Sequence, residues 1–327
     1  MPGKFILKEL CRYNIGTYAD IIYRNAILYP DKEAFVYGTQ RISFAQYNER
    51  VNSLIHALTG MGVKKGGVLG ILSWNCLDYI DIFGATMKCG LIASPYNPRL
   101  NADELTYLIN YYEAQTLFVG TELIETANQL KLRLPKVKNY ISLETAASGM
   151  ISHGELLKTQ AKNEPDIWVE EDDPFIIFYT SGTTGVPRGG LYTHRRKMED
   201  TRLFTLELAL EYGNRELMAI PLFHVAGASY LFAFFFSAAA NIIYPQQTFD
   251  PASFLQMIQD EQNDIHIVPT HLVIMLGLPE IRQYELNTLK RVWYAGSPMP
   301  VEILKRGWTC WVRFLCGSAA NPAKEFR

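Results

Sequence analysis

Short apolar runs alternate with stretches of helical spacing along this chain, and this alternation constrains the fold more than any other feature. The runs at 68–72 and 91–93 are continuous and apolar, as expected of buried strands. Between them, residues 76–89 carry apolar side chains at the spacing of a helix with one buried face. Strands that alternate with helices in this way predict an α/β fold with a largely parallel sheet.

The same pattern predicts further elements along the chain. Helices are expected over 44–61, 102–113, 200–212, from 227 onward, 249–261 and 271–276, and strands over 117–119, 174–178, 217–220, 241–244, 265–268 and 289–294. Asn101 is expected to cap the helix at 102, with Glu104 at the third helical position. Residues 131–162 are predicted to be mostly loop, and no internal repeat is evident.

Composition narrows the class of partner. The chain has 327 residues, 31 basic and 33 acidic, for a formal net charge of −2. It contains no basic stripe, so nucleic-acid binding is not expected. Five cysteines without a pattern predict free thiols in a reducing compartment: Cys11, Cys76, Cys89, Cys310 and Cys316. The N-terminus lacks the apolar segment of a signal peptide, so a cytoplasmic location is expected.

Residues 225–244 form a stretch of twenty residues without a charge. By length it could span a bilayer. Gly227, Ser229, Ser237 and Asn241 interrupt it, and its second half is typical of a strand. We therefore expect a buried helix followed by a strand and no transmembrane span, while peripheral association with a membrane stays open.

The strand expected at 174–178 leads directly into a loop rich in glycine and hydroxyl groups, Y-T-S-G-T-T-G-V-P-R-G-G at 179–190. Glycines let a backbone approach an anion, successive N–H groups form a cradle, and hydroxyls add donors. Arg188 adds a fixed positive charge. The loop matches neither the P-loop nor the dinucleotide pattern. It suits phosphate binding. The alternative for the loop is an ordinary surface turn, and the alternative for Arg188 is a solvated surface charge.

This loop closely resembles the signature of the adenylate-forming (AMP-binding) enzymes, which include acyl-CoA synthetases, luciferases and peptide-synthetase adenylation domains. Four further segments resemble family elements in the family's order: I-S-F-A-Q-Y at 42–47, M-K-C-G-L-I-A-S-P-Y-N-P-R-L at 87–100, P-L-F-H-V-A-G at 221–227 and W-Y-A-G-S-P-M-P at 293–300. The resemblance runs from about Tyr18 to Leu304 and is greatest to medium- or long-chain fatty-acyl-CoA synthetases. Aryl-acid ligases share these features.

For the fold, the resemblance implies the N-terminal domain of an acyl-CoA synthetase over residues 1–310. Its two αβ subdomains would stack in αβαβα layers. About 60–200 would form one subdomain, and about 1–59 with 201–310 the other. A homo-oligomer stays open.

For the chemistry, the resemblance implies that a carboxylate attacks ATP to give an acyl-adenylate, which coenzyme A then converts to a thioester. Mg²⁺ assists at the phosphates. The residues implied at the β- and γ-phosphates are Thr180, Ser181, Gly182, Thr183, Thr184, Gly185 and Arg188. The implied catalytic residues are Thr184, Arg188 and His224, the last at the carboxylate. Gly296, Ser297 and Pro298 are implied to lie against adenine.

Each of these residues has a plainer interpretation. His224 is otherwise a satisfied histidine beneath an apolar helix, and the G-S-P segment only a turn. His194 is expected to be structural. His266 and His271 lack the spacing of a metal pair on one helical face, so no metal ligand is assigned. The aromatic run Phe232, Phe234, Phe235 and Phe236 either lines an acyl tunnel or belongs to the core.

The resemblance weakens after about Leu304. The family's Y-G-x-T-E segment, whose Glu helps to bind magnesium, is not found, although Gly317 and Ser318 echo it. Residues 311–327 are treated as an atypical tail, and the mobile C-terminal domain with its catalytic Lys is absent from the sequence. The expectation is a truncated or frame-shifted ligase with impaired activity. The alternative is a non-catalytic nucleotide- or acyl-binding module completed by a partner chain.

Overall fold

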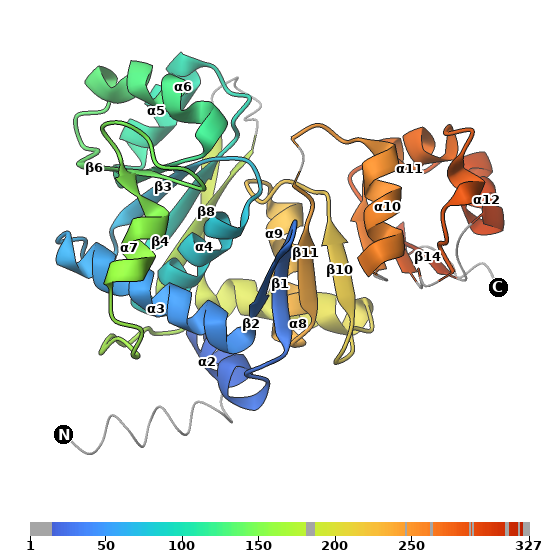
Figure 1. Ribbon diagram of the computed structural model, residues 1–327, viewed down its shortest axis with the longest axis horizontal. Helices are drawn as coiled ribbons and strands as arrows, with labels where there is room; N and C mark the ends of the chain where they lie inside the picture. Colours follow the sequence, from blue (N-terminus) through green and yellow to red (C-terminus); the bar gives the residue numbers. More distant parts are fainter. Residues whose placement is uncertain are drawn as a thin grey trace.

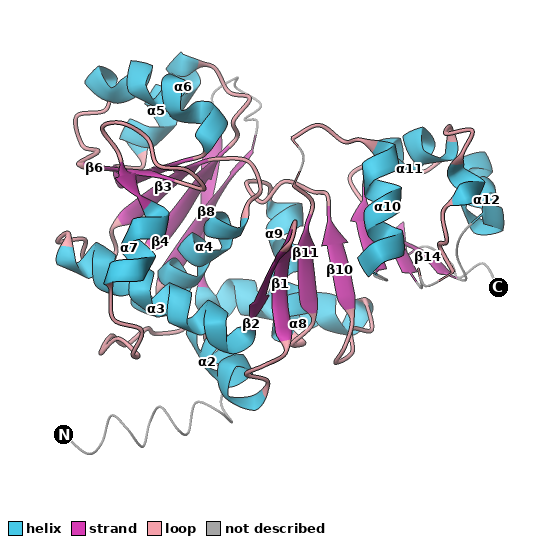
Figure 2. Ribbon diagram, viewed as in Figure 1, coloured by secondary structure: helices cyan, strands magenta, loops and turns pink. Residues whose placement is uncertain are grey.

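The computed structural model describes residues 15–180, 187–245, 247–261, 264–287, 289, 291–310, 314–319 and 321–322. These residues form two β-sheets, one of seven and one of eight strands, and both are covered by helices (Figure 1; Figure 2). The expected α/β class is therefore confirmed.

The seven-stranded sheet has the order β7-β6-β5-β3-β4-β8-β9. Its strands are β3 (Val68–Leu72), β4 (Ile92–Tyr96), β5 (Ala114–Val119), β6 (Asn139–Ser142), β7 (Ile151–Ser152), β8 (Pro174–Thr180) and β9 (Arg188–Thr193). Neighbours run parallel except β8 and β9, which form an antiparallel hairpin with Thr180 opposite Arg188. The glycine- and hydroxyl-rich loop therefore connects two paired strands.

The eight-stranded sheet has the order β15-β14-β13-β12-β10-β11-β1-β2. Its strands are β1 (Glu33–Tyr37), β2 (Gln40–Ser43), β10 (Arg215–Met218), β11 (Ala240–Ile243), β12 (Asp264–Ile267), β13 (Arg291–Tyr294), β14 (Phe314–Ala319) and β15 (Asn321–Pro322). Only the edge strands β2 and β15 run antiparallel to their neighbours. β14 pairs with β13, with Gly317 opposite Tyr294, so this sheet continues into the segment after residue 310.

Helices fill three layers around the two sheets. The layer between the sheets contains α3 (Phe44–Gly60), α4 (Leu77–Cys89), α8 (His194–Glu207) and α9 (Val225–Phe236), with α2 (Tyr18–Leu28) and α7 (His153–Thr159) packed on α3. α5 (Ala102–Tyr111) and α6 (Ile124–Leu130) cover the outer face of the seven-stranded sheet, and α10 (Pro251–Glu261), α11 (Pro269–Leu276) and α12 (Val301–Cys310) cover that of the eight-stranded sheet. The expected αβαβα arrangement is confirmed.

The largest apolar core lies between the two sheets and draws residues from both. Phe35 on β1 stacks on Phe235 of α9, with ring centroids 5.7 Å apart. Phe83 of α4 contacts Phe232 of α9 at 5.8 Å. Because aromatic side chains bury the largest apolar areas, these contacts contribute much of the free energy that holds the sheets together.

Local capping chemistry explains where two helices begin. The side chain of Asn101 accepts hydrogen bonds from the N–H groups of Asp103 and Glu104, and the Glu104 carboxylate accepts one from the Asn101 N–H. The expected capping box is therefore confirmed. Ser43 and Gln46 form a second box at the start of α3, which gives the I-S-F-A-Q-Y segment a structural role.

The loop-like region contains short elements that were not expected, and the expected start of one helix was wrong. Residues 131–162 contain β6, β7 and α7 as well as loop. These elements are two to seven residues long, too short to show a period in the sequence. α8 begins at His194 rather than near residue 200, because the hydroxyl of Thr193 caps it. Its first turn is rich in arginine and lysine, so no apolar period marks it.

The uncharged stretch 225–244 folds as α9 followed by β11, as expected. Its helix packs between the sheets, and nine of its residues are buried. Among the described residues, no helix is both long and apolar enough to cross a bilayer.

Candidate functional site

A cavity of about 500 Å³ lies where parallel strands of the eight-stranded sheet end. Its walls come from residues at or just after the carboxyl ends of β10, β11, β12 and β13. α9, which follows β10, lies on the inner face of this sheet, and α11, which follows β12, lies on the outer face. The chain thus leaves neighbouring strands in opposite directions, and such a switch point is where open α/β sheets bind ligands.

His224 is exposed at this cavity and begins helix α9. Its Nδ1 accepts a hydrogen bond from the Ala226 N–H at 3.2 Å, so the ring acts as the N-cap. The last position of the motif must be glycine, since a Cβ on Gly227 would lie 2.4 Å from the Pro221 carbonyl oxygen. The P-L-F-H-V-A-G segment is therefore a tight entry into α9 that presents an imidazole at the cavity.

Asn75 holds this entry in place from the other sheet, a role that the sequence analysis missed. It follows β3 of the seven-stranded sheet. Its side-chain amide donates to the Ile220 carbonyl at 3.0 Å and accepts from the Leu222 N–H at 2.8 Å. A polar residue just after a buried strand was the available signal. Asn75 thus ties the loop that carries His224 to the neighbouring subdomain.

A row of three side chains in contact, a guanidinium over an indole and an edge-on phenyl ring, crosses from one subdomain to the other beside this loop. The guanidinium of Arg99 lies 4.7 Å from the ring centroid of Trp74, which in turn contacts Phe223 at 6.4 Å. Arg99 lines the same cavity as His224. A cation held over an aromatic face keeps its charge while its position is restricted. Arg99 therefore brings positive charge to the cavity, another role that the sequence analysis did not assign.

The segment expected to contact adenine is an exposed turn directly after β13. Gly296 has φ +95°, a conformation that favours glycine, and it lines the cavity with His224. Ser297 and Pro298 follow it and are exposed. The structure thus brings His224 and Gly296, which are 72 residues apart, to one cavity.

The glycine- and hydroxyl-rich loop is described only at its two ends. Ser181, Gly182, Thr183, Thr184 and Gly185 lie outside the described residues. The Thr180 hydroxyl lies 3.5 Å from the Arg188 carbonyl oxygen, and both residues are exposed. β8 runs parallel to β4, so this loop and Arg99 leave the same edge of the sheet.

Tyrosines support the base of this hairpin. The Tyr112 hydroxyl accepts from the Gly189 N–H at 2.6 Å and donates to the Gly189 carbonyl at 3.3 Å. A Cβ on Gly189 would lie 2.7 Å from that hydroxyl, so glycine is required for the contact. Tyr179 and Ser94 share a hydrogen bond of 2.5 Å between their hydroxyls. The backbone beside Arg188 is therefore held on both sides.

Two histidines, the buried His266 and the half-buried His271, form part of the cavity wall. His266 on β12 stacks on Tyr230, and His271 on α11 stacks on Phe249. Burial lowers the pKa of His266 to about 3 and that of His271 to about 4. Both are therefore neutral near pH 7. The sequence analysis assigned them no metal, and it did not anticipate that they share a cavity with His224.

The aromatic run of α9 belongs to the core rather than to an acyl tunnel. Phe232, Phe234 and Phe235 are at most 5% exposed. Phe232 packs against Tyr18, Phe83 and Phe175, and Phe234 packs against Trp293. His194 is also buried, with its Nδ1 accepting from the Tyr18 N–H at 3.2 Å. These side chains pack the interior and do not reach the cavity.

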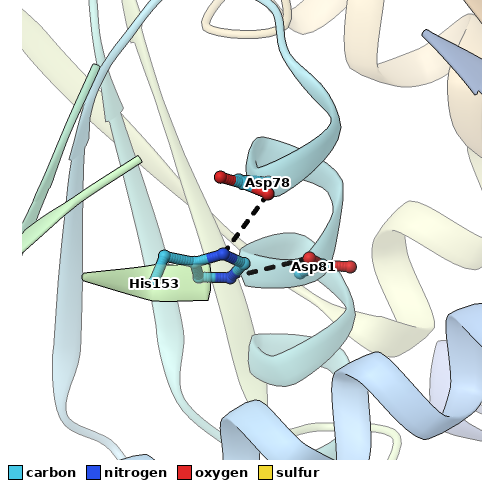
Figure 3. Close-up of side chains that lie close together, drawn as sticks. All are labelled: Asp78, Asp81 and His153. Atoms are coloured by element: carbon cyan, nitrogen blue, oxygen red, sulfur yellow. Dashed lines mark ion pairs between the residues drawn. The ribbon is translucent and has the colours of Figure 1, made fainter. Parts of the chain in front are cut away.

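A second group of acid and histidine side chains lies in the interior of the middle layer (Figure 3). We call it the closed cluster: Arg50, Asp78, Asp81 and His153. The ring nitrogens of His153 lie 3.3 Å from Asp78 and 3.5 Å from Asp81, one on each side (Figure 3). His153 and Asp81 have no exposed surface.

The composition of the closed cluster matches a metal site, but its charges are already paired. Arg50 binds Asp81 through Nε at 3.0 Å and Nη2 at 2.5 Å, and it lies 3.3 Å from Asp78. Burial opposes ionisation of Asp78, but hydrogen bonding and charge from His153 outweigh it and lower its pKa to about 2. A metal ion beside this guanidinium would be repelled. We therefore assign no metal here.

A larger cavity, of about 660 Å³, borders this closed cluster. Its two lysines are already paired, Lys158 with Glu155 and Lys162 with Glu49, and Glu144 accepts a hydrogen bond from the Tyr37 hydroxyl. Of the residues implied by the family resemblance, none that the structure describes lines it. Size alone therefore does not identify the site, and the strand-end cavity remains the candidate.

Comparison with known proteins places the chain among acyl-CoA synthetase relatives. The family model described as "AMP-binding enzyme" matches residues 22–317. YngI of Bacillus subtilis is 29% identical over 91% of this chain and 59% of its own length. The long-chain-fatty-acid–CoA ligase FadD13 of Mycobacterium tuberculosis is 26% identical over 89% of this chain and 57% of its own length. The chain thus spans less than two thirds of these relatives.

Solved structures show the same fold. The inhibitor-bound N-terminal domain of FACL13 from Mycobacterium tuberculosis has a TM-score of 0.84 at 25% identity, covering 93% of this chain and 76% of that domain. The anthranilate CoA ligase AuaEII, in complex with anthranoyl-AMP, has a TM-score of 0.87 at 22% identity, covering 93% of this chain and 60% of the ligase. Since the family match includes both the loop after β8 and the strand-end cavity, the chain belongs to the AMP-binding enzyme family, with the fold of the N-terminal domain of its acyl-CoA ligases.

Proposed function

We propose that this chain joins ATP and a carboxylic acid as an acyl-adenylate with release of pyrophosphate, and that the thiol of coenzyme A then takes the acyl group as a thioester with release of AMP. One observation carries the proposal: His224 and the turn at Gly296 line one cavity at the strand ends. β8 and β4 run parallel, so the loop that follows β8 and Arg99, which follows β4, leave the sheet at the same edge. Fatty-acid and anthranilate ligases both occur among the relatives, so the proposal at this level covers alkyl and aryl acids.

The proposed roles follow from position and charge. Residues 180–185 and Arg188 would hold the β- and γ-phosphates, since backbone N–H groups, hydroxyls and a guanidinium all favour anions. Among the described residues Arg188 has no ion-pair partner, which leaves its charge available. Gly296, Ser297 and Pro298 would lie against adenine. His224 would meet the acid's carboxylate.

Magnesium, which the family generally uses, would offset charge on the phosphates. We assign none of the described side chains to it. Coenzyme A would act after the adenylate has formed, so adenylate formation can be measured without it.

The experiment is acid-dependent exchange of pyrophosphate into ATP by the purified chain. Arg188→Ala and Thr184→Val should each lower exchange by roughly 100-fold or more, as expected when a preorganised charge-stabilising donor is lost. Arg196→Ala is the matched control, because Arg196 is an exposed arginine paired only with Glu199 on α8.

Each outcome has a defined meaning. If both variants exchange as fast as the parent, the phosphate assignment is wrong. If the parent binds AMP but shows no exchange with any acid, the non-catalytic binding role replaces the proposal.

A further inference from the structure

Tyr112 is the C-cap residue of helix α5, and its side chain reaches the hairpin that carries Arg188. Its hydroxyl accepts a hydrogen bond from the Gly189 N–H at 2.6 Å and donates one to the Gly189 carbonyl at 3.3 Å. Within the described residues, β9 is the edge strand of its sheet and pairs only with β8. One side chain thus pairs with both backbone groups of an edge residue, as a further strand would do.

The ring of Tyr112 contacts the other strand of the same hairpin. It lies edge-on to the ring of Tyr179, with centroids 5.2 Å apart. Tyr179 on β8 stands opposite Gly189 on β9 in the register of the hairpin. Tyr179 is itself fixed, because its hydroxyl shares a hydrogen bond with that of Ser94 on β4. Tyr112 therefore contacts both strands at one level, directly beside Arg188.

Close packing at Gly189 restricts this strand further. A Cβ on Gly189 would lie 2.7 Å from the Tyr112 hydroxyl and 2.5 Å from Cγ2 of Ile177. Atoms this close leave the backbone little room to shift, because close-packed groups have few voids around them. The position of the backbone next to Arg188 is therefore set by contacts from α5 and β8.

Arg188 has few contacts of its own. It is exposed, and among the described residues no ion pair holds its guanidinium. The Thr180 hydroxyl lies 3.5 Å from its carbonyl oxygen, which is long for a hydrogen bond. An arginine side chain has many rotamers, and ordering it on a ligand costs conformational entropy. The groups that fix the backbone at this point therefore decide where the charge of Arg188 can reach.

We propose that Tyr112 is a positioning residue that holds Arg188 in place for the β- and γ-phosphates of ATP. This inference rests on the proposed function, which puts Arg188 at those phosphates. Tyr112 lies outside every segment that resembles a family motif, and it acts through the backbone of Gly189 rather than on the substrate. Because AMP lacks both phosphates, Tyr112 should influence the binding of ATP and leave that of AMP unchanged.

The test is calorimetric binding of ATP and of AMP to the purified chain, each with Mg²⁺ and without any acid. We expect the parent to bind ATP tighter than AMP. Tyr112→Phe removes only the hydroxyl, and it should weaken ATP binding roughly tenfold, as expected for the loss of one or two hydrogen bonds, while AMP binding stays the same. Tyr107→Phe is the matched control, since Tyr107 is an exposed tyrosine on the same helix, and it should change neither affinity.

A double variant tests whether Tyr112 acts through Arg188. Arg188→Ala should remove most of the preference for ATP over AMP. If Tyr112 only positions this side chain, adding Tyr112→Phe to Arg188→Ala should weaken ATP binding no further, because the two residues form one coupled unit. A full additional loss in the double variant would show that Tyr112 acts independently of Arg188, and it would overturn the inference.

The outcomes separate this inference from the proposed function. ATP binding in Tyr112→Phe that equals the parent's overturns the inference and leaves the phosphate assignment intact. Equal losses for ATP and AMP overturn it as well, because they indicate a general structural role. A parent that binds ATP no tighter than AMP, or that binds neither, overturns both the inference and the assignment of Arg188 to the phosphates.

Discussion

Two groups of polar side chains in this molecule contain the same residue types but differ in pairing and burial. The strand-end cavity exposes His224, Arg99 and the turn at Gly296. The closed cluster hides His153 and Asp81 completely and links them to Arg50. A histidine with two carboxylates is often a sign of chemistry, yet here that set joins α4 to α7 and α3.

The comparison shows that pairing, more than residue type, separates a site from a structural link. In the closed cluster the guanidinium of Arg50 already contacts both carboxylates, so a cation would have to displace an existing interaction. At the strand-end cavity, the only contact of the Arg99 guanidinium within the described part of the chain is with the face of Trp74, and His224 uses one nitrogen as a helix cap. Groups of this kind can take a substrate without breaking the fold.

The largest expected effect comes from breaking the closed cluster. Asp81→Asn leaves Arg50 without its bidentate partner in the interior, and we expect a loss of about 3–5 kcal/mol in the free energy of unfolding. Urea denaturation measures it. Lys158→Ala, which removes an exposed ion pair with Glu155, should cost under about 1 kcal/mol. A cost for Asp81→Asn as small as the control's would show that the closed cluster is not a structural link.

Acid should destabilise the protein through its buried neutral histidines. The folded pKa of His194 is lowered by burial from 6.5 to about 4, so protons bind the unfolded chain more readily in this range. Stability is therefore full above pH 6.5 and falls as the pH drops toward 4. For His194 alone the loss is on the order of 3 kcal/mol. Asp78, with a folded pKa of about 2 against 3.8, adds a further loss only below about pH 4.

Urea midpoints between pH 4 and 7 test this titration. His194→Gln should weaken the dependence, because glutamine does not titrate, whereas His266 and His271 still do. His56→Gln, on the surface-facing side of α3, is the matched control and should leave it unchanged. Equal pH dependence in His194→Gln and the parent would contradict the assignment.

Removing the clamp between the sheets should have an intermediate effect. Asn75→Ala leaves the Ile220 carbonyl and the Leu222 N–H without their partner, at a cost of about 1–3 kcal/mol. Because the clamped loop leads to His224, exchange activity should fall as well. Asn163→Ala, in an exposed loop, is the control. Unchanged exchange in a destabilised Asn75→Ala would limit this residue to a structural role.

The smallest effect on stability, with a clear effect on function, is expected at the cavity itself. His224→Asn keeps an N-cap acceptor and removes the imidazole, so unfolding should change by less than about 0.5 kcal/mol. Acid-dependent exchange should nevertheless fall strongly. His224→Ala separates the effect of the helix cap on stability from the effect of the imidazole on activity, since it removes both. Full exchange activity in His224→Asn would place the acid elsewhere.

Much of the local structure could be predicted because its causes are local. The strand at 68–72 and the capping box at Asn101 follow from neighbouring residues alone. β9 was missed because it is a mostly exposed return strand without an apolar run. The start of α8 was missed because arginines and lysine conceal its period.

The site divides in the same way. P-L-F-H-V-A-G and the turn at Gly296 are local shapes, fixed by a close glycine contact and by a positive φ, so their motifs could be found in the sequence. Asn75 was not assigned, because its partner Ile220 lies 145 residues away in the chain. Arg99 was not assigned, because its place depends on the contact of Trp74 with Phe223 in the other subdomain. The roles of His266 and His271 likewise depend on neighbours from other elements.

By itself, the sequence determined the α/β class, the family, and the segments expected to bind phosphate, acid and adenine. Short-range periodicity is sufficient for the fold class, whereas the family and these segments follow from the resemblance of the motifs to those of the AMP-binding enzymes. Only the tertiary structure decided that His224, Gly296, Arg99 and two further histidines share one cavity, and that Asp78, Asp81 and His153 are a closed link. The reason is physical: strand order and the packing of two sheets are long-range properties, and they decide which polar groups find partners.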